Sequence, residues 1–204
     1  MKTLARTPFP SVDARLLEIA AGLLKAHGVK AVTVVGVAER AGMTHANVYR
    51  YFPSKAALID AIAARWLKSL EATIAEIADA PDPADDKLER LIQAQARAQR
   101  DLLAADRHLF DVYCGATETN RALVRKHRAR LRELVERVLD EGMATAKFDP
   151  RERDRALGFI ADAAYRFVHP VAVRLDAEIP PDILEQRLAA MIRVILRALA
   201  NGSV

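Results

Sequence analysis

Polar and phenolic side chains of different types stand close together between residues 44 and 50, and a lysine follows at position 55. Asparagine can pair bidentately with adenine, threonine and histidine can bond to several bases, and tyrosine and arginine can hold phosphate oxygens. A lysine at the start of a helix lies where backbone N–H groups already favour an anion, such as a phosphate. We therefore expect a surface that binds double-stranded DNA. The residues assigned to it are Thr33, Thr44, His45, Asn47, Tyr49, Arg50 and Lys55.

Two short helices bent around Gly42 are predicted to position these side chains. Thr33 can cap a first helix of about two turns, whose apolar residues recur at the spacing of a half-buried helix. Gly42 permits the left-handed backbone conformation that ends a helix at a tight corner. Thr44 can cap the second helix, over residues 45–51. A helix, a glycine turn and a second helix form the helix-turn-helix motif.

The stretch from Gly28 to Leu58 resembles the N-terminal domain of TetR-family transcriptional repressors. The family pattern matches at Gly28, Thr33, Val37, Ala38, Ala41, Gly42, Thr44, Tyr49, Tyr51, Phe52, Ser54, Lys55 and Leu58. Gly36 departs from the pattern, since an acidic or polar residue is common there. Ala46 and Asn47 also depart from it, in place of a frequent Gly-Thr pair. These departures bear on which operator is recognised, not on DNA binding itself.

The resemblance implies an all-α fold with two domains. Residues 1–70 would form a three-helix helix-turn-helix domain, with a basic N-terminal arm and the start of a fourth helix. Residues 71–204 would form a helical ligand-binding and dimerisation domain. The implied protein is a homodimeric repressor that binds a palindromic operator and is released by a small-molecule inducer. The residues before Ser11 are either a plain tail or a basic arm that enters a minor groove.

The distribution of charge supports the assignment of DNA binding to the N-terminal domain. Residues 1–70 hold 10 Lys and Arg against 4 Asp and Glu, a net charge of +6, whereas residues 71–204 hold 21 against 23, a net charge of −2. The basic end is thus the end with the motif. No apolar run approaches the roughly 20 residues of a membrane helix, and the first ten residues lack the apolar core of a signal peptide. With Cys114 as the single cysteine, we expect a cytoplasmic protein with no membrane association.

Long helices are predicted for the rest of the chain. One runs from Lys55 past Trp66 to a proline-rich break at residues 78–86, and is long enough to connect both domains. Others are expected at roughly 84–104, 106–115, 118–146, 150–175 and 181–200, with breaks indicated by Gly115, Gly142, Pro150, Pro180 and Pro181. The last two carry broad apolar stripes. In the family they form a four-helix dimer interface, so we expect dimerisation through residues 150–200, including Ile192 and Ile195.

The inducer site is less clearly marked than the DNA surface. A mainly apolar small molecule is expected between the C-terminal helices, where bulky side chains are common and charges few. The residues assigned to this site are Leu103, Phe110, Tyr113, Cys114, Tyr165 and His169. By contrast, His127 lies in the basic run RALVRKHRARLRE, which indicates a solvated helix face.

Catalysis is not expected, because the sequence contains no phosphate-binding loop, glycine-rich dinucleotide turn, HExxH motif or nucleophile elbow. His108, Cys114 and His169 lack the spacing of a recognised metal site, and no cofactor is expected. Two alternatives to a ligand-responsive repressor remain. One is a helical dimeric adaptor, and the other is a redox sensor that uses Cys114 and has a secondary role in DNA binding.

Overall fold

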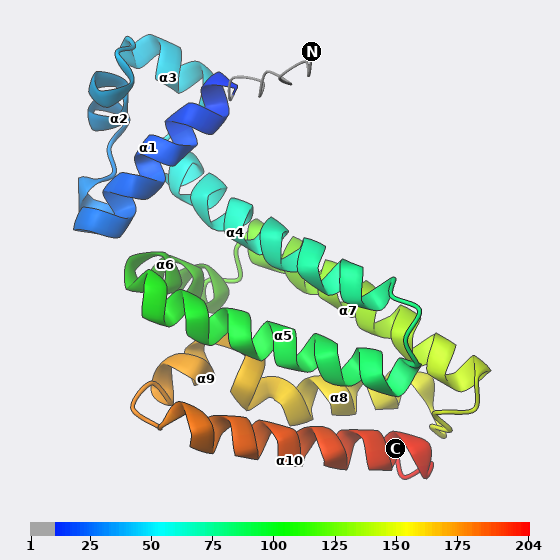
Figure 1. Cartoon of the computed structure of the whole chain (residues 1–204). Coiled ribbons are helices and arrows are strands. Elements are labelled where there is room, and N and C mark those ends of the chain that lie inside the picture. Colours follow the sequence, from blue (N-terminus) through cyan, green and yellow to red (C-terminus); the bar gives the residue numbers. More distant parts are fainter. Residues whose placement is uncertain (1–10) are drawn as a thin grey trace, which may run out of the picture. The chain divides into compact units, whose positions relative to one another are not determined.

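The computed structural model describes residues 11–204 and contains helices and loops but no strand in this range, which confirms the predicted all-α fold (Figure 1). The basic arm predicted around Lys2 and Arg6 lies outside the described residues. In chain order the helices are α1 (Val12–His27), the 3-10 helix η1 (Val29–Ala31), α2 (Val34–Ala41), α3 (His45–Tyr51), α4 (Lys55–Ala78), α5 (Ala84–Ala105), α6 (Arg107–Glu118), α7 (Ala122–Ala144), α8 (Arg153–Val168), α9 (Pro170–Leu175) and α10 (Pro181–Ala200).

The chain divides into two compact units, and the division falls between Ala64 and Arg65, within α4. In the first unit α1 packs on α2, and α2 packs on α3. Its core is apolar because each helix turns one stripe inward. The fully buried side chains of this core include Leu16, Leu24, Val37, Ala38, Val48 and Leu58.

In the second unit, α5 contacts α7 on one side and α8 on the other, and α8 in turn packs on α10 (Figure 1). A single large apolar cluster fills the space between these helices and the second half of α4. Its members include Ile74, Leu88, Leu91, Leu134, Leu139, Phe148, Ile160, Ile192, Ile195 and Leu199. Ile192 and Ile195 are 1% and 0% exposed. The expectation that these two residues face a partner protomer is therefore wrong, since they pack inside the monomer.

Three of the predicted helix boundaries also differ from the structure. Gly115 and Gly142 do not end helices, because they lie within α6 and α7. A Cβ on Gly142 would lie 2.0 Å from Cδ2 of Phe148, so glycine is required there for close packing. The helix expected over residues 150–175 is interrupted between α8 and α9. Pro170 follows His169 at this point, and proline has no amide hydrogen with which to continue the helix.

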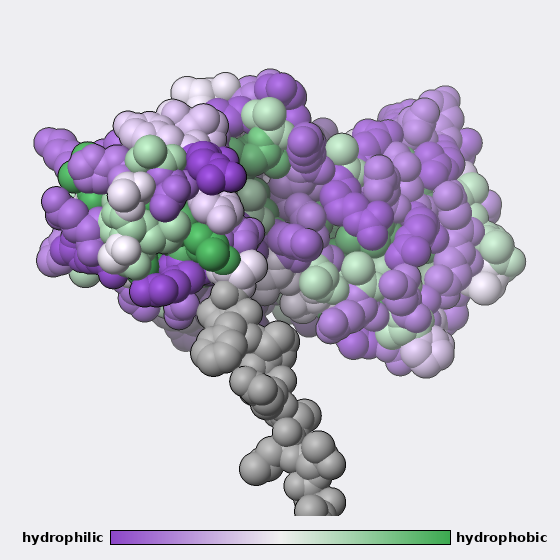
Figure 2. Space-filling view, turned by 90° about the horizontal axis from the view of Figure 1, so that it is seen from above, coloured by the Kyte–Doolittle hydropathy of each residue, from purple (hydrophilic) through white to green (hydrophobic). Residues whose placement is uncertain are grey.

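The surface seen in Figure 2 is mostly hydrophilic, with hydrophobic residues gathered only in small groups. Among the described residues, none of the helices combines the length and the apolarity that a membrane crossing requires.

Candidate nucleic-acid interface and ligand cavity

Short-range hydrogen bonds hold the two helices of the helix-turn-helix motif, α2 and α3. Thr33 Oγ1 accepts a hydrogen bond from the Gly36 amide at 3.0 Å, and Thr44 Oγ1 accepts one from the Asn47 amide at 3.4 Å. Between the helices Gly42 has φ 65°, a left-handed conformation that residues with a Cβ rarely adopt. Both predicted caps and the predicted turn are confirmed. Together they fix the direction in which α3 leaves the corner.

Only one side chain of α3 is buried, and it anchors the helix. Val48 is fully buried, whereas Tyr49 is 50% exposed. The other exposed polar side chains of α3 and its cap are Thr44, His45, Asn47 and Arg50. Among the described residues, no carboxylate lies within ion-pair distance of Arg50. The helix thus presents donors, acceptors and a positive charge on a solvent-facing surface.

Lys55 opens α4 and is partly buried. Its Nζ donates a hydrogen bond to the carbonyl of Lys30 at 3.3 Å, so η1 restrains the side chain. Just before it, Ser54 Oγ accepts a hydrogen bond from the Ala57 amide at 3.0 Å, which caps α4. A lysine ammonium has three donors, and Lys30 takes one of them. The remaining donors and the helix N-terminus leave room for an anion.

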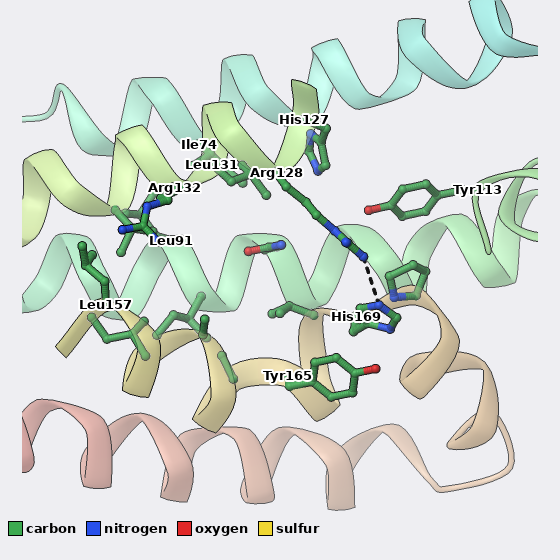
Figure 3. Close-up of a pocket in the computed structure, with 18 residues that line it drawn as sticks. Ile74, Leu91, Tyr113, His127, Arg128, Leu131, Arg132, Leu157, Tyr165 and His169 are labelled. Atoms are coloured by element: carbon green, nitrogen blue, oxygen red, sulfur yellow. Dashed lines mark hydrogen bonds between the residues drawn. The ribbon is translucent and has the colours of Figure 1, made fainter. Parts of the chain in front are cut away.

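The second unit contains a cavity of about 540 Å³ between α4, α5, α7 and α8, near the start of α9 (Figure 3). This volume is within the range of small-molecule sites. Most of the wall is apolar: Ile74, Leu91, Ile92, Leu131, Val135, Leu157, Ile160, Ala161, Ala164, Val168 and Pro170. The polar lining residues are Gln95, Tyr113, His127, Arg128, Arg132, Tyr165 and His169. Aspartate and glutamate are absent from this lining.

His127 belongs to the cavity wall and not to a solvated face, which corrects the prediction from the basic run. Its side chain is 2% exposed, and Nδ1 lies 2.7 Å from Glu71 Oε1 on α4. Burial lowers the pKa of His127, and the contact with Glu71 opposes this shift only in part. The neutral ring therefore donates from Nδ1 to the carboxylate, while Nε2 is buried without a hydrogen-bond partner in the described structure.

The rings beside His127 form a chain of contacts that reaches α4. The rings of Tyr113 and His127 meet in a T-shaped arrangement with centroids 6.3 Å apart, and the Tyr113 ring also packs on Trp66 with centroids 5.2 Å apart. Burial raises the pKa of Tyr113 to about 12, so the phenol stays protonated. Trp66 is the only tryptophan of the chain, and its emission should report changes in the cavity.

His169 marks the other polar corner of the cavity. Its Nε2 lies 3.3 Å from Arg128 Nη2, and its ring stacks on Tyr165 with centroids 4.4 Å apart. Burial, followed by the charge of Arg128, lowers the pKa of His169. Because a guanidinium can only donate, Nε2 must accept and the ring hydrogen must be on Nδ1. That Nδ1 is buried without an acceptor in the described structure.

The six residues assigned to the inducer site do not come together in one place. Tyr113, Tyr165 and His169 line the cavity. Leu103 lines a separate hollow, while Phe110 and Cys114 are fully buried in a cluster with Leu102 and Val173. One residue step turns a helix by about 100°, which directs Tyr113 and Cys114 of α6 to different surroundings.

Cys114 is an unreactive thiol in this setting. It is 0% exposed, and burial raises its pKa to about 11. Thiol reactivity depends on the thiolate, which such surroundings disfavour. The redox-sensor alternative therefore fits the structure less well than the interpretation of Cys114 as a small apolar side chain.

Sequence reasoning missed the residues of α7 that enter the cavity. Arg128 lies among other arginines and lysines, and the sequence around it does not distinguish a residue that lines a cavity from one that faces solvent. The same holds for His127. The apolar lining residues are ordinary members of amphipathic stripes. One pattern could have indicated that a side of this basic helix faces other helices. It is the i, i+1, i+4, i+5 spacing of His127, Arg128, Leu131 and Arg132, which places these four residues on the same side.

Comparison with known proteins agrees with this architecture. Residues 16–62 match the family model of bacterial regulatory proteins of the tetR family, and residues 84–192 match that of the tetracyclin repressor-like C-terminal domain. The HTH-type transcriptional repressor KstR2 of Mycobacterium tuberculosis is 25% identical over 160 residues, which are 75% of this chain and 74% of that protein.

Solved structures share the fold. A protein of unknown function from Rhodococcus sp. RHA1 has a TM-score of 0.72 at 22% identity, over 96% of this chain and 98% of that one. A transcriptional regulator of the TetR/AcrR family from Thermobifida fusca has a TM-score of 0.66 at 21% identity, over 93% and 97% of the two chains. With a capped helix-turn-helix in the first unit and a matching C-terminal domain in the second, the chain belongs to the TetR family of DNA-binding transcriptional regulators.

Proposed function

We propose that the protein is a homodimeric repressor that binds a palindromic operator through α3 of each protomer. The observation that carries this proposal is the exposed polar face of α3, which one buried side chain, Val48, and the N-terminal cap by Thr44 hold in place. In this arrangement Thr44, His45 and Asn47 meet base edges, while Tyr49 and Arg50 hold phosphates. Such a repressor acts on the chromosome, in the cytoplasm.

Two further contacts with the DNA backbone belong to this proposal. Thr33 stands at the N-terminus of α2, and Lys55 stands at the N-terminus of α4. Helix N-termini favour phosphate because their free amides and the helix dipole attract an anion. Neither contact reads sequence, so both should contribute affinity to every duplex.

A second copy of the chain is proposed to pack against the outer face of α8 and α10. Val194 is 54% exposed on this face. It lines a shallow, largely apolar hollow with Ala163, Phe167, Ala190 and Met191, bordered by Arg166 and Arg187. Two-fold symmetry is what a pair of reading helices needs in order to meet half-sites about one DNA turn, ~34–36 Å, apart.

A small, mainly apolar molecule in the cavity is proposed to release the operator. The cavity wall includes Ile74 of α4, and Glu71 of the same helix is bonded to His127. Occupation of the cavity can therefore change the position of α4, which also contains Lys55. Release requires that the ligand prefer the conformation with weaker DNA affinity.

The decisive experiment is a mobility shift with DNA from the promoter region of the protein's own gene, at two salt concentrations and against random duplex. We expect salt-sensitive binding that prefers the promoter DNA. Lys55→Ala should weaken binding to all duplexes alike, and Asn47→Ala should change the preference among them. Lys25→Ala, which removes an exposed charge from α1, is the matched control. A folded dimer that prefers no sequence would contradict the proposed function.

A further inference from the structure

The cavity wall has an unbalanced charge. Two arginines and two histidines line it, and no carboxylate does. Arg132 is neutralised, because its Nε donates to Glu136 at 2.7 Å and its Nη2 lies 3.7 Å from Asp154. In the described part of the chain, Arg128 has no carboxylate within 4.0 Å, and its side-chain hydrogen bond goes to a neutral imidazole. Arg128 is a solvent-exposed residue, so its positive charge is hydrated and is not paired with a carboxylate of the described structure.

The position of Arg128 directs this charge at the cavity. In Figure 3 its side chain extends from α7 toward His169, with Tyr113 and His127 at the same end. The charge acts on all three groups: it opposes the rise that burial gives the pKa of Tyr113, and it adds to the lowering that burial gives the pKa of His127 and of His169. The guanidinium of Arg128 is thus the one positive charge that acts on all three groups, although its effect on each pKa is smaller than that of burial.

Hydrogen-bond donors are also in excess here. A guanidinium has five N–H groups, and His169 accepts only one of those of Arg128, which is exposed, so the others are open to solvent or to a ligand. His169 itself carries a buried N–H on Nδ1 that no described residue accepts. A buried donor without an acceptor is destabilising, so this corner lacks an acceptor-rich group. A carboxylate has two oxygens and can engage a guanidinium fork with both.

The rest of the cavity suits a hydrocarbon. Leu91 and Leu157 lie away from His169 and Tyr113 in Figure 3, with Leu131 and Ile74 between the two ends. These side chains offer no hydrogen bonds, and Arg132 at that end is already paired. A ligand with a polar head at one end and an apolar body would match the whole wall.

We propose that the inducer is an anionic amphiphile, whose carboxylate binds between Arg128 and His169 and whose apolar body lies along α5, α7 and α8. This inference rests on the proposed function, in that the cavity is taken as the inducer site. Beyond the proposed function, it specifies the chemical class of the ligand and names Arg128 as the residue that selects for the carboxylate.

The test compares three probes with the same ten-carbon chain and different heads, namely decanoate, 1-decanol and decylamine, below their aggregation limits. Binding is measured by calorimetry and by Trp66 emission, because Trp66 packs on the cavity residue Tyr113. We expect decanoate to bind roughly 10- to 100-fold more tightly than decanol, the range of a hydrogen bond to a charged group. Equal affinities, a preference for decylamine, or no binding of any probe would overturn the inference.

Variants identify the residue responsible. Arg128→Met keeps an apolar stem and removes the charge, so decanoate should bind only as tightly as decanol, whose own affinity should not change. Arg128→Lys should retain the preference for the carboxylate. Arg132→Met is the matched control, and the preference should stay within about 3-fold because that charge is already paired. Loss of the preference in Arg132→Met with its retention in Arg128→Met would refute the assignment.

Operator release is measured separately on the same samples. Decanoate bound through Arg128 without release from the promoter DNA would leave the ligand class standing and refute the proposed regulation. Release from the operator without any preference for decanoate over decanol would refute the ligand class and leave the proposed regulation standing.

Discussion

The hydrogen bond between His127 and Glu71 connects the cavity wall on α7 to α4. When it is removed, the loss of stability of the second unit should depend on which of the two partners is replaced. Glu71→Leu leaves His127, which is 2% exposed, with neither ring nitrogen bonded. A buried polar group without a partner costs about 1–3 kcal/mol. His127→Leu instead leaves a carboxylate whose side chain is 25% exposed, so water can solvate it. We therefore expect Glu71→Leu to lower the free energy of unfolding by about 2–3 kcal/mol and His127→Leu by roughly 1 kcal/mol.

Urea unfolding followed by Trp66 emission measures this difference, since Trp66 lies in the second unit and contacts the Tyr113 ring beside His127. The double variant should lose less than the sum of the single losses, because apolar replacement of both partners leaves no orphan group. In thermal unfolding, each kcal/mol should shift Tm by about 3–5 °C.

Glu133→Leu provides the control. Glu133 forms an exposed pair with Arg130 on the same helix, and such pairs contribute about 0–1 kcal/mol. The reasoning fails if His127→Leu destabilises as much as Glu71→Leu, or if the two losses simply add.

The remaining predictions concern pH, assembly and DNA. Because burial lowers the folded-state pKa of His127 and His169 below 6.5, the unfolded chain binds more protons. The stability contribution of these histidines should be complete above about pH 6.5 and fall as the pH drops toward the folded values, by about 1.4 kcal/mol for each unit of depression at His127 and by less at the more solvated His169. Urea midpoints measured over this pH range check the prediction. Ile192→Asp should unfold the second unit, as measured by circular dichroism. Val194→Asp should instead give folded monomers, as measured by sedimentation. A folded Ile192→Asp monomer would contradict the placement of Ile192 in the monomer core. Lys55→Ala should reduce the slope of log affinity against log salt by about 2 for a dimer, and an unchanged slope would exclude a phosphate contact.

The DNA-reading end of this protein could be predicted from sequence because its determinants are local. Each cap joins a hydroxyl to an amide three residues later, and the turn depends on the freedom of Gly42 alone. Hydrogen bonds over such short separations need no distant part of the chain. Apolar periodicity and turn residues likewise indicated where the long helices lie, because amphipathic spacing is a property of each helix by itself, while the all-α fold was implied by the family resemblance.

The ligand end was decided by tertiary structure. His127 meets Glu71 across 56 residues, and Arg128 meets His169 across 41. Nothing in the basic run around them distinguishes these side chains from solvated neighbours. Ile192 and Ile195 belong to a stripe that suits either a core or a partner protomer, and only the packing of α10 in the monomer core assigns them to the first. Periodicity shows which side of a helix is apolar, but what covers that side depends on where distant helices pack.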